Sequence, residues 1–221
     1  MPDQNQVSSN EALFAKLAET LSADRIGRYL TATGYDKQRA LALYLWNAKI
    51  GEAFHVPIQA VEVGLRNRIT VSLADLFGSE WWRHNEFKVA IDEDREADLE
   101  TVFRRIRNRG LTLDVGQIVA GLSFGFWVAL LQPRYNPKIW SSHLRVSFPD
   151  LPQDKTRNAL AKRAGEVAFI RNRISHHEPI FRRDLSKDIQ QLLEFLWWIC
   201  PTKAAWIKPH CRVQEVLRQK P

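Results

Sequence analysis

The spacing of apolar residues along most of the chain is the feature that most limits its fold. Ala and Leu recur at intervals of three and four residues among Glu, Lys and Arg, which is the period of an α-helix. Turn dipeptides and alternating β-branched runs, which are typical of strands, are scarce. The sequence therefore predicts an all-α protein, a helical bundle of roughly seven to nine helices.

Capping signals divide the first part of the chain. Residues 1–34 are expected to form an N-terminal helical pair, with the second helix starting at the cap residue Ser22. A third helix should follow Asp36, and a fourth should begin at Pro57 and end at Gly78. The break at Pro57 is expected because proline is favoured in the first turn of a helix and disrupts a helix interior.

The rest of the chain shows three kinds of segment. Asp92–Arg109 should be a charged helix, acidic in its first turns and basic in its last, and Asp114–Leu131 should be a buried helix or helix pair. Residues 132–152 are rich in proline and lack strong periodicity, so they are expected to be a connector. Two convincing helices follow, Gln153–Ser175 and Ser186–Cys200.

Length and cysteine content define the broad class. We expect residues 1–221 to form a single domain, long enough to bury a core without disulfides or a structural metal. The two cysteines, Cys200 and Cys211, have no zinc-site spacing, so no metal and no cofactor is expected. The start carries no secretion signal and no apolar run could span a bilayer, which predicts a cytoplasmic protein without a membrane partner.

Basic charge is concentrated in the last third of the chain. The formal net charge is +7, and the segment from Lys155 to the end holds 14 basic and 6 acidic side chains, an excess of 8. Such a balance favours anionic partners such as nucleic acid.

Arg171 occupies an unusual place on the helix that is expected at Gln153–Ser175. The apolar face of that helix consists of Leu160, Ala164, Val167 and Ile174. Arg171 falls in the middle of this face, and burying an unpaired guanidinium costs several kcal/mol. It must therefore have an acidic partner, for example Glu166, or open into a polar cleft that an anion can enter.

Polar residues follow Arg171 at the expected end of this helix. Asn172 and His176 are four residues apart and share a helix edge, while His177 comes next. Pro179 favours an end near Ser175, because the residue before proline avoids the α conformation. Arg, Asn and His together at a helix end could hold a phosphate and transfer a proton.

This motif resembles that of a known family. The string Arg-Asn-x-x-x-His resembles the R-x4-6-H motif of HEPN domains, and Arg171–Ile180 looks like the version in the Abi-like (abortive infection) family of bacteria. Two upstream segments are also similar to that family: Tyr44–Ile69, with Trp46, Asn47 and Glu62, and Leu122–Gly125.

The resemblance implies a HEPN-like helical core and a homodimer in which two motifs face each other. It implies a metal-independent endoribonuclease, acting in phage defence by abortive infection or in a toxin–antitoxin system. RNA would be the substrate, and an RNA or protein antitoxin would neutralise the enzyme. Because the ribose 2′-OH of RNA is the nucleophile in such a reaction, DNA would not be cleaved.

Residue roles follow from the same resemblance. Arg171 and His176 would be the catalytic pair and Asn172 their polar positioner. His177 also satisfies the spacing, so which histidine acts stays open. Further contacts to RNA are expected from Arg173, Arg182 and Arg183.

Other interpretations of the same residues stay open. His176, His177 and Glu178 could hold a metal, although adjacent histidines without a third ligand rarely do. Glu62 and Arg66 are read as a helix-stabilising i, i+4 pair. The chain could also bind RNA or a partner without cutting, or serve only as a helical dimerisation module.

Overall fold

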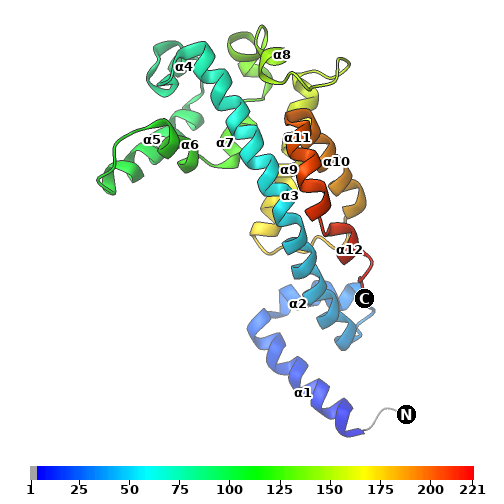
Figure 1. Cartoon of the computed structure of the whole chain (residues 1–221). Helices are drawn as coiled ribbons and strands as arrows, with labels where there is room; N and C mark the ends of the chain where they lie inside the picture. The colour runs from blue at the N-terminus through cyan, green and yellow to red at the C-terminus, as the bar shows by residue number, and fades with distance from the viewer. Residues whose placement is uncertain (1–3) are drawn as a thin grey trace. The chain divides into compact units, whose positions relative to one another are not determined.

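A computed structural model of the chain describes residues 4–221, with side chains from Ala12 onward. These residues are 76% helical and contain no strand (Figure 1). The all-α fold expected from the apolar spacing is confirmed.

The helices of the described chain differ widely in length. The longer ones are α1 (Gln4–Leu21), α2 (Ala23–Ala32), α3 (Lys37–Phe77), α5 (Glu93–Asn108), α6 (Val115–Gly121), α9 (Arg157–Ser175), α10 (Leu185–Ile199) and α11 (Pro201–Ile207). The short ones are α4 (Asn85–Ala90), α7 (Phe124–Ala129), α8 (Leu144–Ser147) and α12 (Val213–Leu217). Within residues 4–221 the number of longer helices agrees with the expected seven to nine. The short ones, of four to six residues, bring the total above this range.

The chain divides into two compact units. Unit 1 comprises the chain up to Val56, Asn172–Ile189 and Cys211–Pro221, and unit 2 comprises Pro57–Arg171 and Gln190–His210. The helices α3, α9 and α10 contribute residues to both units. The expectation of one domain stays a prediction.

Pro57 does not start a new helix, contrary to the expectation from the sequence. α3 runs without interruption from Lys37 to Phe77 and contains Pro57 (Figure 1). Buried positions recur every three or four residues on both sides of the proline: Leu43, Asn47, Ile50, Phe54, Ile58, Val61, Leu65, Ile69 and Leu73. Burial of this continuous stripe outweighs the one backbone hydrogen bond that proline removes.

In unit 2, α3 packs closely against α10. A Cβ atom at Gly64 would lie only 3.1 Å from Ile199 Cγ2, so the absence of a side chain permits this approach. The Arg68 Nε donates to the Ile199 carbonyl at 3.0 Å, which satisfies a carbonyl at the end of α10. α9 joins the same bundle through Arg163, which pairs with Glu194 of α10 at 2.9 Å.

The charged helix α5 has the expected limits. The Asp92 carboxylate accepts from the Arg95 N–H at 3.0 Å as its N-cap, and Gly110, with φ +68°, follows its end. The next segment is a helix pair, α6 and α7, as expected. The Ser123 hydroxyl caps α7 by accepting from the Phe126 N–H at 3.3 Å, and the bend therefore lies just before Ser123.

Residues 132–152, expected to be a connector, contain a 3-10 turn at Pro133–Tyr135, a π turn at Asn136–Trp140 and then α8. The Trp140 indole N–H donates to the Leu130 carbonyl at 2.6 Å, and the hydroxyls of Ser72 and Ser147 lie 2.6 Å apart. These buried polar contacts anchor the segment to the rest of unit 2.

Unit 1 has its own core around Tyr29, which contacts the rings of Tyr44 and Phe181 at centroid distances of 5.2 and 5.1 Å. The Trp46 indole N–H donates to the Val216 carbonyl at 2.8 Å, which ties α3 to α12. Among the described residues, no helix combines the length and apolar character needed to cross a membrane.

Candidate active site

The end of α9 is built as a Schellman motif. The helix stops at Ser175, and the Glu178 N–H donates to the Arg173 carbonyl at 2.8 Å. The His177 N–H donates to the Ile174 carbonyl at 3.0 Å. These two bonds satisfy carbonyls that the last turn leaves open. Arg171 therefore lies in the last turns of a helix that ends before Pro179, as the sequence predicts.

His177 occupies the left-handed position of this motif, where glycine is usual. Its φ is +54°, a conformation that costs an L-residue about 1 kcal/mol. The Arg25 guanidinium donates to the His177 carbonyl at 2.7 Å and thereby helps to hold the turn. The side chains of His176 and His177 are exposed, so both imidazoles are accessible to solvent.

Asn47 of α3 binds the segment that follows the histidines. Its side chain is only 8% exposed, and its carbonyl oxygen accepts from the Ile180 N–H at 2.8 Å. Its amide nitrogen donates to the Glu178 carbonyl at 3.4 Å. A buried amide that bridges two backbone groups fixes the course of the chain on leaving α9.

Arg173 is held at the same helix end. Its guanidinium donates to the Pro179 carbonyl at 2.9 Å and lies 3.3 Å from the Glu178 carboxylate. These contacts indicate that Arg173 stabilises the turn. Its proposed contact with RNA stays a prediction.

Arg171 has an acidic partner, and that partner is Glu62 of α3. Its Nε donates to the Glu62 carboxylate at 2.8 Å, and the two side chains are 38% and 26% exposed. Glu166, the partner considered from the sequence, pairs with Arg163 instead, at 2.8 Å. The ion pair fixes one edge of the Arg171 guanidinium while part of the side chain stays accessible.

Glu62 was interpreted from the sequence as the i, i+4 partner of Arg66, and that interpretation is wrong. In the described chain its carboxylate bonds to Arg171. A fixed arginine on α9 offers better hydrogen-bond geometry than a neighbour on the same helix, where exposed pairs contribute only tenths of a kcal/mol.

The other expected site residues lie on both sides of this end. Asn172 is exposed on the last turns of α9, next to Arg171 in the chain. Arg182 is exposed and lies over the Phe181 ring, 5.6 Å from its centroid. Arg183 is bound by both oxygens of Asp188, at 2.8 Å each. Its bidentate ion pair orders the start of α10.

Sequence reasoning did not assign roles to Asn47 and Arg25, although both position the backbone of the motif. Asn47 belongs to a segment that the family resemblance includes. A polar residue on an otherwise apolar helix face indicates that its side chain positions a neighbouring group by hydrogen bonds. Arg25 gives no such signal because its contact with His177 is purely tertiary.

Chemically, this part of the chain offers a partly exposed guanidinium and two exposed imidazoles. A guanidinium binds phosphate oxygens and an imidazole exchanges protons near neutral pH. Within the described residues, no three His, Cys, Asp or Glu side chains gather where they could hold a metal ion.

Comparisons of the chain with protein-family models, with curated proteins and with solved structures found no match.

Proposed function

We propose that this chain is a metal-independent endoribonuclease of the HEPN type. The observation that carries this proposal is the exposure of His176 and His177 at the end of α9, four and five residues after Asn172. Arg171 is oriented by Glu62 but keeps 38% of its side chain exposed, which suits a group that meets a substrate.

The reaction uses a nucleophile that RNA itself supplies. A histidine removes the proton of the ribose 2′-OH, and the 2′ oxygen attacks the adjacent phosphorus. The bond from phosphorus to the 5′ oxygen breaks, and that oxygen takes up a proton from an imidazolium. The products are a 2′,3′-cyclic phosphate and a 5′-hydroxyl. Arg171 contacts the phosphate oxygens more strongly as negative charge develops on them.

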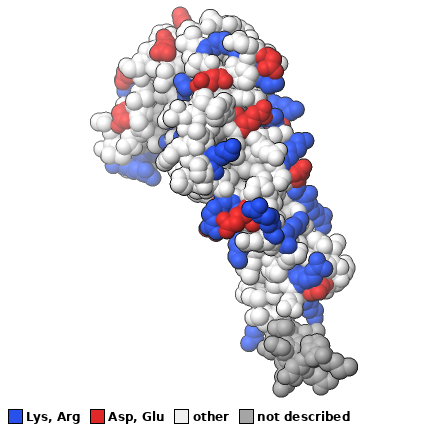
Figure 2. Space-filling view, turned by 45° about the vertical axis from the view of Figure 1, so that its right-hand side comes forward, with Lys and Arg blue, Asp and Glu red and all other residues white. Residues whose placement is uncertain are grey.

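Asn172 is the polar positioner in this scheme. His176 is the first choice for proton transfer because it is the histidine of the Arg-Asn-x-x-x-His string, and His177, which also satisfies the R-x4-6-H spacing, is the second. Arg173, Arg182 and Arg183 add positive charge along the RNA backbone. Figure 2 shows Lys and Arg side chains spread widely over the face in view, with Asp and Glu among them.

A homodimer would supply two arginines and two sets of histidines, consistent with the twofold symmetry common among oligomers. The biological setting that we propose is phage defence by abortive infection or a toxin–antitoxin system. An RNA or protein antitoxin would keep such an enzyme inactive in the cell.

The test is incubation of the purified protein with mixed RNA in excess EDTA, followed by analysis of the product ends. We expect cleavage with 2′,3′-cyclic phosphates and no cleavage of single-stranded DNA. Cleavage that disappears on chelation, or that survives in the His176→Ala, His177→Ala double variant, would refute the mechanism.

A second candidate is a HEPN-like module that binds RNA or a protein without cutting. The Arg171–Glu62 ion pair favours it, because a carboxylate partner neutralises the charge that a phosphate would otherwise meet. Retention of uncut RNA by the wild-type protein at low salt, unchanged in Arg171→Ala, would support this alternative.

A further inference from the structure

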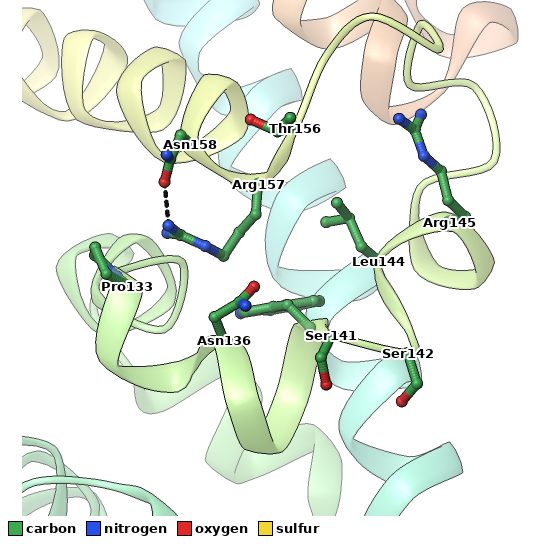
Figure 3. Close-up of a pocket in the computed structure, with 10 residues that line it drawn as sticks. Pro133, Asn136, Ser141, Ser142, Leu144, Arg145, Thr156, Arg157 and Asn158 are labelled. Atoms are coloured by element: carbon green, nitrogen blue, oxygen red, sulfur yellow. Dashed lines mark hydrogen bonds between the residues drawn. The ribbon is translucent and has the colours of Figure 1, made fainter.

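An open pocket of about 640 Å³ lies in unit 2, beside the start of α9 (Figure 3). It is lined by Pro133, Asn136, Trp140, Ser141, Ser142, Leu144, Arg145, Thr156, Arg157 and Asn158. The lining thus contains two arginines and no acidic residue. Its size falls in the range of small-molecule sites, about 300–1,000 Å³.

Arg157 is the unusual member of this lining. Its side chain is only 8% exposed, and it donates to the Leu131 carbonyl and to the Asn158 side-chain oxygen. Both acceptors are neutral, and Arg157 makes no ion pair within the described chain. Burial lowers the pKa of its guanidinium, but arginine remains charged in proteins. A positive charge without a counter-charge therefore stands at the pocket wall.

Arg145 supplies the second positive charge. Its guanidinium donates to four backbone carbonyls, those of Leu151, Pro152, Gln153 and Lys155, at 2.7 to 3.1 Å. These contacts order the chain that enters α9. Lys155 and, more weakly, Arg145 lower the pKa of the Asp154 carboxyl, so an acidic group stands near this cation. Arg145 therefore shapes one wall of the pocket, and Arg157 is the cation of the lining that has no carboxylate partner within the described chain.

Neutral hydrogen-bond donors complete the lining. Ser141, Thr156 and Asn136 belong to the same lining, although the Ser141 hydroxyl donates to the Pro137 carbonyl at 3.1 Å. Figure 3 shows Asn136 and Asn158 on either side of the Arg157 guanidinium. α9 begins at Arg157, and the first N–H groups of a helix have no partner within it. Their dipoles add to the attraction for an anion.

We propose that this pocket binds the phosphate group of a small molecule, a site independent of the ribonuclease chemistry at the other end of α9. A compact phosphoryl group can reach a nearly buried guanidinium, whereas an RNA backbone needs an open track. A phosphoryl group offers the guanidinium charged oxygens, which neutral ligands lack.

Isothermal titration calorimetry with inorganic phosphate and with AMP, in chloride buffer of matched ionic strength, tests this site. Ser141→Glu places a carboxylate in the pocket, where it competes with phosphate for the guanidinium. We expect affinity for both probes to fall by about tenfold or more. Ser79→Glu, a matched control at an exposed serine outside the pocket, should leave affinity unchanged.

Arg157→Met should abolish binding, and Ser141→Glu keeps the test valid if that variant fails to fold. Equal weakening by Ser79→Glu would mean an adventitious ion only and would overturn the proposal. Binding of a 12-nucleotide RNA at the pocket without binding of AMP would also overturn it. RNA cleavage by Ser141→Glu is expected to match the wild type, so failure here is distinguishable from failure of the proposed function.

Discussion

The two ends of α9 carry arginines in contrasting surroundings. Arg157, at the start, is 8% exposed and bonded to neutral acceptors, whereas Arg171, near the end, is 38% exposed and bonded to the Glu62 carboxylate. The same residue type on the same helix is buried without a counter-charge in one place. It is accessible and neutralised in the other.

The difference separates two uses of a guanidinium. A buried cation acts through a low dielectric and attracts any small anion that reaches it. An accessible cation whose orientation is set by a carboxylate binds weakly at rest, and it can respond to charge that develops during a reaction. We therefore propose binding for the start of α9 and chemistry for its end.

The largest expected effect concerns the chemical end. His176→Ala should lower the turnover number by about 10² to 10⁴ and leave RNA affinity nearly unchanged, because an imidazole contributes little to ground-state phosphate binding. Single-turnover cleavage and a binding titration measure the two quantities. His55→Ala, an exposed histidine on α3, is the matched control. An equal loss in both variants would break the assignment of chemistry to this end.

The next effect concerns stability. Here the substitution at the start of α9 should have the larger effect, and the one near its end the smaller. Arg157→Met leaves a carbonyl and an amide oxygen without their donor, which should lower the free energy of unfolding by about 2–4 kcal/mol. Arg171→Met breaks a partly exposed ion pair and should cost about 1 kcal/mol or less. Urea unfolding followed by circular dichroism compares them. Equal losses of unfolding free energy would show that the difference in burial between the two arginines does not affect stability.

Arg171→Lys sharpens the comparison at the chemical end alone. A lysine keeps the charge but cannot bond to Glu62 and a phosphate through one planar group, so turnover should fall by about 10². The control is Arg163→Lys, which changes an arginine of the same helix that also pairs with glutamate. If the turnover number stays the same in Arg171→Lys but is lost in Arg163→Lys, Arg171 has a structural role and not a catalytic one.

The fold was largely readable from local signals. Ser22, Asp92 and Asp114 cap their helices with the side-chain bonds that their types suggest, and Gly110 takes a positive φ where a helix ends. The continuity of α3 through Pro57 was not readable. Proline is a local break signal, and the tertiary burial that overrides it leaves no mark within a few residues of the sequence.

The candidate site likewise has a part that neighbouring residues in the sequence predict and a part that they do not. The end of α9 follows from Pro179, a neighbour in the chain, and was predicted. The partner of Arg171 is 109 residues away and was not, because spacing along one helix says nothing of the helix packed against it. Asn47 and Arg25 act through equally distant contacts.

Asn172→Ala should have a milder effect than the catalytic substitutions. A positioning amide can be replaced in part by water, so turnover should fall by about tenfold or less. Asn67→Ala, at the same place in another Arg-Asn-Arg tripeptide, is a control without histidines nearby in the chain. Multiple-turnover kinetics would show the change, and a loss as large as that of His176→Ala would give Asn172 a direct part in the reaction.

The smallest expected effect concerns the strained turn after α9. His177→Gly relieves the left-handed conformation, offset in part by the greater freedom of glycine in the unfolded chain, so stability should rise by about 0.5–1 kcal/mol. Tyr35→Gly, at an exposed residue with φ +64°, should give a similar gain and serves as the control. Thermal unfolding measures both.

The two variants should differ in activity only if the His177 imidazole reacts, because Tyr35 lies outside the motif. A stabilised His177→Gly protein with full turnover leaves His176 as the reacting histidine, and a stabilised but inactive one transfers that role to His177. A variant that is destabilised would mean that contacts of the His177 side chain outweigh the backbone strain, which would contradict the account of this helix end.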